Sequence, residues 1–131
     1  MAEPAGESRS EPVVDMWART LQSDHFRREI LTSRHGQVVL MTIPAGGQIG
    51  EEVHPDVDQI LVFTDGQGEA IMDGVTSPVR EGVLAFVKAG TRHNFVNTGS
   101  GPLRLFTVYA PPEHPPGTVH RTKEEADAAE E

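Results

Sequence analysis

The chain contains no cysteine, and that absence removes several kinds of chemistry at once. Disulfide bonds, thiolate metal ligands and a cysteine nucleophile are all excluded. A chain without cysteine is compatible with a reducing compartment. The opening residues MAEPAGESRSEP carry acids and no apolar core, unlike a signal peptide. We therefore expect a cytoplasmic protein.

Long apolar runs and basic patches are also missing. No stretch approaches the ~20 apolar residues that cross a bilayer, so no membrane partner is expected. Lysine and arginine total 11 against 20 acidic residues, and the net charge is −9. Because no basic stripe is present, the chain is not expected to bind nucleic acid.

Length and composition fit one folded domain. The chain has 131 residues, of which 37% are hydrophobic. Pro, Gly, Ser and Glu dominate residues 1–12, which we predict to be a disordered acidic N-terminal tail. A single domain is expected over residues 13–120. Residues 121–131 are predicted to be an acidic C-terminal tail or a frayed helix, because their helix formers lack an apolar face.

A short helix is predicted before the first strand. Residues 15–22 have helical composition, and Asp15 is placed to cap the N-terminus. Trp17 and Leu21 are four residues apart and share one helix face. We expect this face to cover the barrel as a lid.

Short β-prone runs separated by turn residues fill the chain from Phe26 onward. Many short strands with Gly and Pro turns at this spacing predict an all-β sandwich or barrel. The expected strands are 26–33, 37–43, 50–54, 59–64, 68–73, 77–80, 82–87, 92–97 and 103–110.

Glycines mark several of the turns between these strands. Gly46, Gly66, Gly82 and Gly90 are expected to adopt positive φ or to allow close backbone approach. On this basis Gly90→Val is expected to unfold the region around His93.

Two segments have fixed internal spacings that point to a known family. The first contains Gly46, Glu52, His54, Gln59 and Gly66; the second contains Gly82, Lys88, Gly90, His93 and Asn97. Their order and spacing resemble the two motifs of the cupin superfamily. The sequence departs from the family pattern at three positions. Glu52 stands where the first His is usual, Gln59 where Glu is usual, and Lys88 where Pro is usual.

The resemblance covers roughly residues 26–110 and implies a fold. Cupins are double-stranded β-helices, that is, jelly-roll barrels. The chain is most similar to small bacterial single-domain cupins, many of which carry a mannose-6-phosphate isomerase-like label. The family does not specify a reaction, because it includes oxygenases, isomerases, decarboxylases, lyases, sugar-binding proteins and storage proteins.

Strand geometry independently brings the polar residues of these motifs together. Glu52 and His54 are two residues apart and share a strand face, as do Gln59, Leu61 and Phe63 and, on a third strand, His93, Phe95 and Asn97. In a closed barrel such faces point inward. A buried acid or imidazole without a partner costs several kcal/mol, and a bound metal ion removes that cost.

The predicted cofactor is therefore one divalent metal, Fe, Mn or Zn. Glu52, His54 and His93 have the composition of a set of two histidines and one carboxylate, which leaves open positions. Gln59 is the candidate for a fourth, weaker ligand. Asp58 is its rival, but strand alternation turns it to the opposite face unless a bulge intervenes. An empty barrel, with Glu52 hydrogen-bonded to a histidine, is the alternative.

Several other residues are candidates for the cavity. Tyr109 is expected either to offer a proton above the metal or to satisfy a buried hydrogen bond. His35 is expected in a turn or an interface. His114 and His120 belong either to the cavity mouth, to a dimer contact or to a packed surface loop. The predicted cavity residues are Met41, Leu61, Phe63, Phe95 and Tyr109, with core packing as the alternative for each.

These features favour a metalloenzyme acting on a small polar or anionic metabolite, as an oxygenase, lyase or isomerase. An isomerase is less favoured because Glu52, the candidate base, would be a ligand. The alternative is a non-catalytic module that binds a small molecule or a metal. An interaction domain would need a large exposed apolar face, which the strand pattern does not indicate.

A homodimer is expected from the family and from the need to cover edge strands, with residues 26–33 as the predicted edge.

Overall fold

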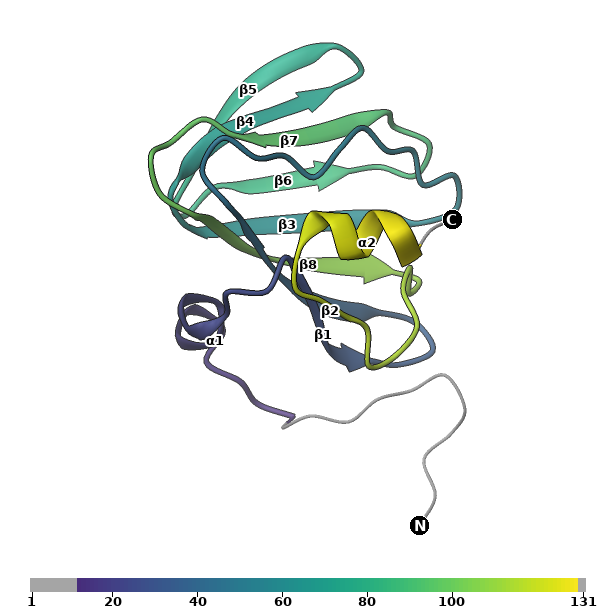
Figure 1. Cartoon of the computed structure of the whole chain (residues 1–131). Coiled ribbons are helices and arrows are strands. Elements are labelled where there is room, and N and C mark those ends of the chain that lie inside the picture. The colour runs from purple at the N-terminus through teal and green to yellow at the C-terminus, as the bar shows by residue number, and fades with distance from the viewer. Residues whose placement is uncertain (1–11, 130–131) are drawn as a thin grey trace.

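Antiparallel strands are the predominant secondary structure in the computed structural model, which describes residues 12–129 (Figure 1). All of the predicted N-terminal tail except Pro12 lies outside the described residues. The two helices are α1 (Met16–Gln22) and α2 (Lys123–Ala129). The strands are β1 (Arg27–Thr32), β2 (Gln37–Ile43), β3 (Asp58–Asp65), β4 (Gln67–Met72), β5 (Val75–Arg80), β6 (Leu84–Val87), β7 (His93–Asn97), β8 (Leu103–Ala110) and β9 (Val119–His120).

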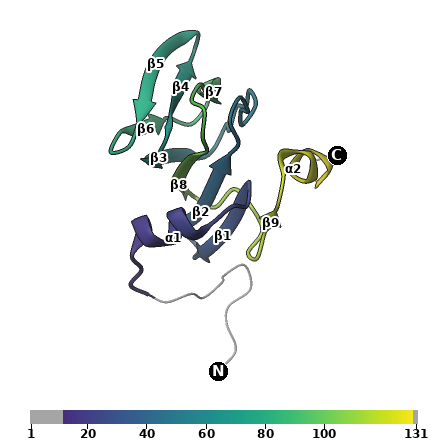
Figure 2. The same cartoon turned by 60° about the vertical axis from the view of Figure 1, so that its left-hand side comes forward.

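These strands form two sheets that face one another. The larger sheet has the order β6-β3-β8-β2-β1-β9, and the smaller has the order β5-β4-β7. The segment after β2 adds two isolated antiparallel bridges to β7, Gln48 to Val96 and Glu52 to His93. This arrangement is the predicted double-stranded β-helix, and it encloses the inward faces of both sheets (Figures 1 and 2).

Strand alternation builds the core as expected. Along β8 the buried positions alternate with partly exposed ones, so every second side chain points inward. The predicted cavity residues are all buried, and the rings of Phe63 and Phe95 lie 5.8 Å apart. Their burial fits core packing, and a direct role in ligand binding stays a prediction. The buried set comprises Met41, Leu61, Phe63, Phe95 and Tyr109.

Two parts of the strand prediction were wrong. Residues 50–54 form no strand, since Gly50 has φ of 109° and only the bridge at Glu52 pairs with β7. The sequence analysis also missed β9, a two-residue strand that pairs with Arg27 and Arg28. Because β9 covers that end of β1, residues 26–33 are not a fully open edge.

Helix α1 confirms the predicted helix but not its position as a lid. The Asp15 side chain accepts a hydrogen bond from the Ala18 backbone N–H at 3.1 Å, which caps the helix. Trp17 packs edge-on to Phe106, with ring centroids 6.3 Å apart. Phe106 points away from the core on β8, so α1 covers the outer face of the large sheet.

The C-terminal segment folds back on the barrel and ends in helix α2. Thr122 Oγ1 accepts from the Glu125 N–H, and the Glu125 carboxylate accepts from the Arg121 N–H. Ala126 is buried in the core cluster, so this helix has a small apolar face that the sequence analysis did not find. Figure 2 shows α1 and α2 on opposite sides of β1 and β2.

An apolar patch lies on the outer face of β3 and β6. Ile60, Leu84 and Phe86 are exposed, and Ile60 is paired directly with Phe86 in the sheet. The patch lies at the edge of the large sheet, because β6 is a short edge strand whose outward residues are apolar. Neither helix in the described part of the chain is long and apolar enough to span a membrane.

Candidate metal centre

Backbone pairing brings the two halves of the centre together. Glu52 and His54 lie in the loop between β2 and β3, and His93 is the first residue of β7. The Glu52 N–H donates to the His93 carbonyl at 2.9 Å, and the His93 N–H donates back at 3.0 Å. The Gly90 N–H donates to the His54 carbonyl at 2.8 Å. Residues about 40 positions apart are thus held side by side by their backbones.

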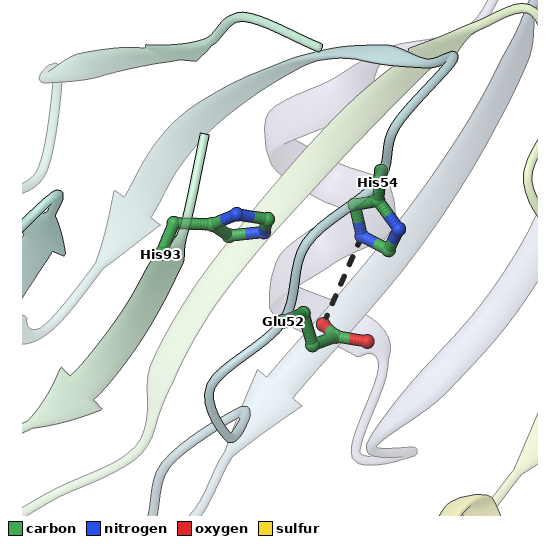
Figure 3. Close-up of side chains that lie close together, drawn as sticks. All are labelled: Glu52, His54 and His93. Atoms are coloured by element: carbon green, nitrogen blue, oxygen red, sulfur yellow. Dashed lines mark ion pairs between the residues drawn. The ribbon is translucent and has the colours of Figure 1, made fainter. Parts of the chain in front are cut away.

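The three side chains converge on one small volume (Figure 3). One ligand atom from each of Glu52, His54 and His93 lies within 4.8 Å of the other two. Nε2 of His54 is 4.0 Å from Oε1 of Glu52, and the two imidazole centroids are 5.2 Å apart. These distances suit atoms that surround a shared cation rather than hydrogen-bond each other directly.

A backbone carbonyl orients the imidazole of His93. Its Nδ1 lies 2.8 Å from the Thr91 carbonyl oxygen, so Nδ1 carries the proton and Nε2 keeps its lone pair. Burial lowers the pKa of His93; the Thr91 carbonyl acts in the opposite direction, and the nearby His54 lowers the pKa further. The imidazole is therefore neutral at neutral pH, as a metal ligand must be.

His54 has one nitrogen directed to each of two carboxylates. Nδ1 is 3.4 Å from Oε1 of Glu113, and Nε2 faces Glu52. A proton on Nδ1 would point to the Glu113 carboxylate, and the lone pair on Nε2 would then be available to a metal ion. Nε2 is buried and has no hydrogen-bond partner, which is costly for a polar atom. A cation beside Nε2 removes that cost.

Glu113 was missed by the sequence analysis because its position depends on a distant side chain. The side-chain oxygen Oε1 of Gln37 accepts hydrogen bonds from the backbone N–H groups of Glu113 and His114 at 3.2 and 3.0 Å. The Gln37 amide group donates to the His114 carbonyl and to Thr32 Oγ1. These hydrogen bonds fix the Pro-rich segment, residues 111–116, to the adjoining ends of β1 and β2. The segment in turn directs the Glu113 carboxylate toward His54.

Glu113→Gln is expected to weaken metal binding by about 10-fold, the lower end of the effect of outer-shell partners. The amide has no negative charge to hold the Nδ1 proton of His54. Isothermal titration with Zn²⁺ measures the loss. Glu51→Gln is the matched control, because Glu51 lies next to Glu52 but is paired with Arg92 at 2.7 Å. Equal Zn²⁺ affinities of the two variants would contradict the orienting role of Glu113.

Gln59 is directed inward as predicted. It is buried, its amide group donates to Thr107 Oγ1 at 3.0 Å, and its carbonyl oxygen has no hydrogen-bond partner. Its role as a fourth ligand stays a prediction. Asp58, the rival, is exposed and accepts a hydrogen bond from the Ala89 N–H at 2.8 Å. It faces away from the cavity, as alternation requires.

The other histidines separate into two groups. His35 is exposed in the turn between β1 and β2. His114 packs edge-on to Tyr109 with centroids 5.3 Å apart, and Tyr109 in turn lies 6.1 Å from the His54 ring. His120 accepts a hydrogen bond from Arg27. His114 thus packs on the Tyr109 side of the barrel and His120 on Arg27, and their assignment to the cavity mouth, a dimer contact or a packed surface loop stays a prediction.

Acid should destabilise the fold through His114. Burial, together with Arg27, His120 and His54, lowers its pKa from 6.5 to about 3. Between these pH values only the unfolded chain binds the proton. Stability is therefore complete above pH 6.5 and falls as the pH drops toward 3, by up to about 1.4 kcal/mol per pH unit. Urea unfolding from pH 7.5 to 4.5 should show a steeper loss for the native chain than for His114→Asn. Parallel curves would contradict this.

Two cavities adjoin the C-terminal helix. One, of about 260 Å³, is lined by Arg27, Ile49, Gly50 and Glu52, together with residues of α2. The other, of about 580 Å³, lies between Asp24, Arg104 and Lys123 and contains no residue of the cluster. Of these two cavities, the smaller is the one lined by a residue of the cluster, Glu52.

The residues present fit a divalent cation. The cluster offers one carboxylate and two imidazoles, and the buried Nε2 of His54 has no hydrogen-bond partner. Such a set suits Fe(II), Mn(II) or Zn(II) with open positions. The fold and this cluster define a double-stranded β-helix with a candidate metal site in its interior.

Comparison with known proteins identifies the family. A family model described as a cupin domain matches residues 39–109, and the chain belongs to the cupin family. It is 43% identical to protein YrkC of Bacillus subtilis (strain 168) over 125 residues, which cover 91% of this chain and 67% of that one. The mannose-6-phosphate isomerase-like label is not confirmed.

Solved structures agree with this assignment. The crystal structure of BH2720 from Bacillus halodurans matches with a TM-score of 0.89 and 41% identity, over 91% of this chain and 95% of that chain. A predicted oxalate decarboxylase from Thermotoga maritima matches with a TM-score of 0.56 and 24% identity, over 64% and 68% of the two chains. The second likeness supports the fold alone.

Proposed function

We propose that this cupin is a metalloenzyme that acts on a small polar or anionic metabolite. The observation that carries the proposal is the buried Nε2 of His54, which has no hydrogen-bond partner and faces the Glu52 carboxylate beside His93. Glu52, His54 and His93 would hold the cation, with Gln59 as a further donor. A bound divalent ion would supply Lewis acidity toward a carbonyl or carboxylate oxygen.

The protein's own groups have separate tasks in this proposal. Thr91 and Glu113 orient the two imidazoles through Nδ1, so that both Nε2 atoms face inward. The Phe95 ring packs against the His93 ring, with centroids 6.1 Å apart, and gives the site an apolar neighbour on that side. With Glu52 as a ligand and Glu113 engaged with His54, neither carboxylate is a free base. This favours a lyase or an oxygenase over an isomerase.

Turnover is tested with protein loaded with Mn²⁺ or Fe²⁺ and incubated in air with small carboxylates and sugar phosphates. Proton NMR spectra should show that one compound class is consumed by the loaded native chain and not by the loaded His54→Ala/His93→Ala variant. Binding of a compound without consumption would support the alternative, a non-catalytic binding module. Consumption at equal rates by both proteins would contradict the site.

Homodimerisation and a cytoplasmic location stay predictions. The apolar outer face of β3 and β6, with Ile60, Leu84 and Phe86, is a better candidate for the dimer contact than residues 26–33. Phe86→Glu should then convert a dimer to a monomer at micromolar concentration. Light scattering that finds the native chain already monomeric would contradict this.

A further inference from the structure

Arg27 is a buried charge that the metal centre does not use. It is the first residue of β1, its side chain points inward, and the residue is 3% exposed. A guanidinium group keeps its charge at any physiological pH and carries five N–H donors but no acceptor. A buried charge of this kind is costly unless an opposite charge and hydrogen bonds compensate for it.

The contacts of Arg27 do not provide that compensation. One terminal nitrogen lies 3.2 Å from Nδ1 of His120, which must accept because arginine cannot. The guanidinium carbon lies 5.4 Å from the centroid of the Phe26 ring. Nε is buried without a hydrogen-bond partner. Within residues 12–129 no carboxylate lies at ion-pair distance from Arg27.

Arg104 shows how the same chain compensates another poorly exposed arginine. Its two terminal nitrogens contact Asp65 at 2.8 Å and Asp24 at 3.0 Å, and its Nε faces the Ser23 carbonyl. Among residues 12–129, Arg104 therefore has two carboxylate partners, whereas Arg27, which is more deeply buried, has none. The difference indicates that an anion from outside the chain completes the surroundings of Arg27.

The position of Arg27 places such an anion next to the metal centre. Arg27 and Glu52 line the same cavity of about 260 Å³. The other cation there, Lys123, is paired with Asp127 at 2.8 Å.

We propose that Arg27 binds the oxyanion end, a carboxylate or phosphate group, of a small metabolite whose other oxygen atoms reach a cation held by Glu52, His54 and His93. The inference rests on the proposed function and narrows it to anionic substrates that are bound at two points. The planar fork of a guanidinium group matches a carboxylate with two parallel hydrogen bonds. The cavity has room for a compound of a few carbon atoms.

The test is isothermal titration of Zn²⁺-loaded protein with succinate and, separately, with inorganic phosphate. The native chain should bind at least one of them, and Arg27→Met should bind it about 10-fold or more weakly, since hydrogen bonds to a charged group are lost. Tighter binding of succinate identifies a carboxylate, and tighter binding of phosphate identifies a phosphorylated metabolite. Zn²⁺ affinity should be unchanged, which separates this inference from the proposed metal site.

The melting temperature is a second measurement, and it distinguishes an anion-binding arginine from one that only stabilises the fold. Metal-free Arg27→Met should melt about 3 °C above the native chain, because an uncompensated buried charge is removed. Arg104→Met, the matched control, should melt lower, because two carboxylates lose their partner. If Arg27→Met does not fold, Arg27→Lys replaces it in the titration, and its single ammonium group should weaken binding about 5-fold.

Three results would overturn the inference. The first is equal affinity for both anions in the native chain and in the Arg27 variant that folds. The second is absence of anion binding by native protein that binds Zn²⁺ normally. The third is a lower melting temperature for Arg27→Met together with native affinity in Arg27→Lys. In each case the metal site itself is untouched, whereas failure of the native chain to bind Zn²⁺ would instead contradict the proposed function.

Discussion

Replacing both His54 and His93 by alanine is expected to lower Zn²⁺ affinity by well over 100-fold. Loss of a group that only supports a ligand already costs about 10–100-fold, and here two ligands are removed. The native chain at a Zn²⁺ concentration 100 times the Kd should gain about 2.7 kcal/mol of stability from the metal. The variant should gain none. Metal titration and thermal melts with and without Zn²⁺ measure both quantities.

His35→Ala is the control for this prediction. It also removes one imidazole, but His35 is exposed in a turn. It should bind Zn²⁺ like the native chain. The metal-free double variant loses the hydrogen bond from His93 Nδ1 to the Thr91 carbonyl, so its own metal-free melting temperature is the baseline for any metal-dependent rise. If the double variant kept the metal-dependent rise in melting temperature, the ion would have to bind elsewhere.

Gly66→Val is expected to have the largest effect on the fold. Gly66 has φ of 87°, and an added Cβ would collide with the Pro102 carbonyl oxygen and lie 3.0 Å from Leu103 Cα. Both obstacles are backbone atoms at the start of β8, so they cannot move aside cheaply. We expect a loss of about 4 kcal/mol or more in the free energy of unfolding, in the range that marks severe backbone and packing defects.

Gly90→Val separates the effect of the positive φ from the effect of the collision with backbone atoms. Gly90 has the same φ of 87°, but no atom lies within 4 Å of an added Cβ. Only the positive φ is then unfavourable, and the expected cost is about 1–3 kcal/mol. Urea unfolding of both variants makes the comparison. Equal losses would show that the contact with Pro102 and Leu103 has no effect. The expectation from the sequence, that Gly90→Val unfolds the region around His93, thus becomes a milder one.

Alternation and motif spacing predicted the centre of the barrel well. Gln59, Leu61 and Phe63 point inward because side chains alternate along a strand, and this holds for β3. The spacing of the two family motifs predicted that Glu52 and His93 lie close together. The observed cause is an antiparallel backbone bridge in a segment that forms no strand.

The residues that sequence analysis missed are those whose position depends on tertiary contacts. Glu113 lies in a Pro-rich segment without periodicity, and the side-chain amide of Gln37, far away in sequence, fixes it. Arg27 belongs to the inward face of β1, but the usual exposure of arginine hides that signal. Trp17 was assigned to the wrong surface because helical spacing identifies a face and not the surface it covers.

The central claim is that one carboxylate and two imidazoles from separate segments share a single cation. Anomalous diffraction just above the zinc absorption edge, from a crystal grown with Zn²⁺, tests it most directly. We predict one strong peak about 2.0–2.2 Å from Nε2 of His54, Nε2 of His93 and a carboxylate oxygen of Glu52. A zinc-bound crystal whose anomalous peak lies away from these three atoms would contradict the claim.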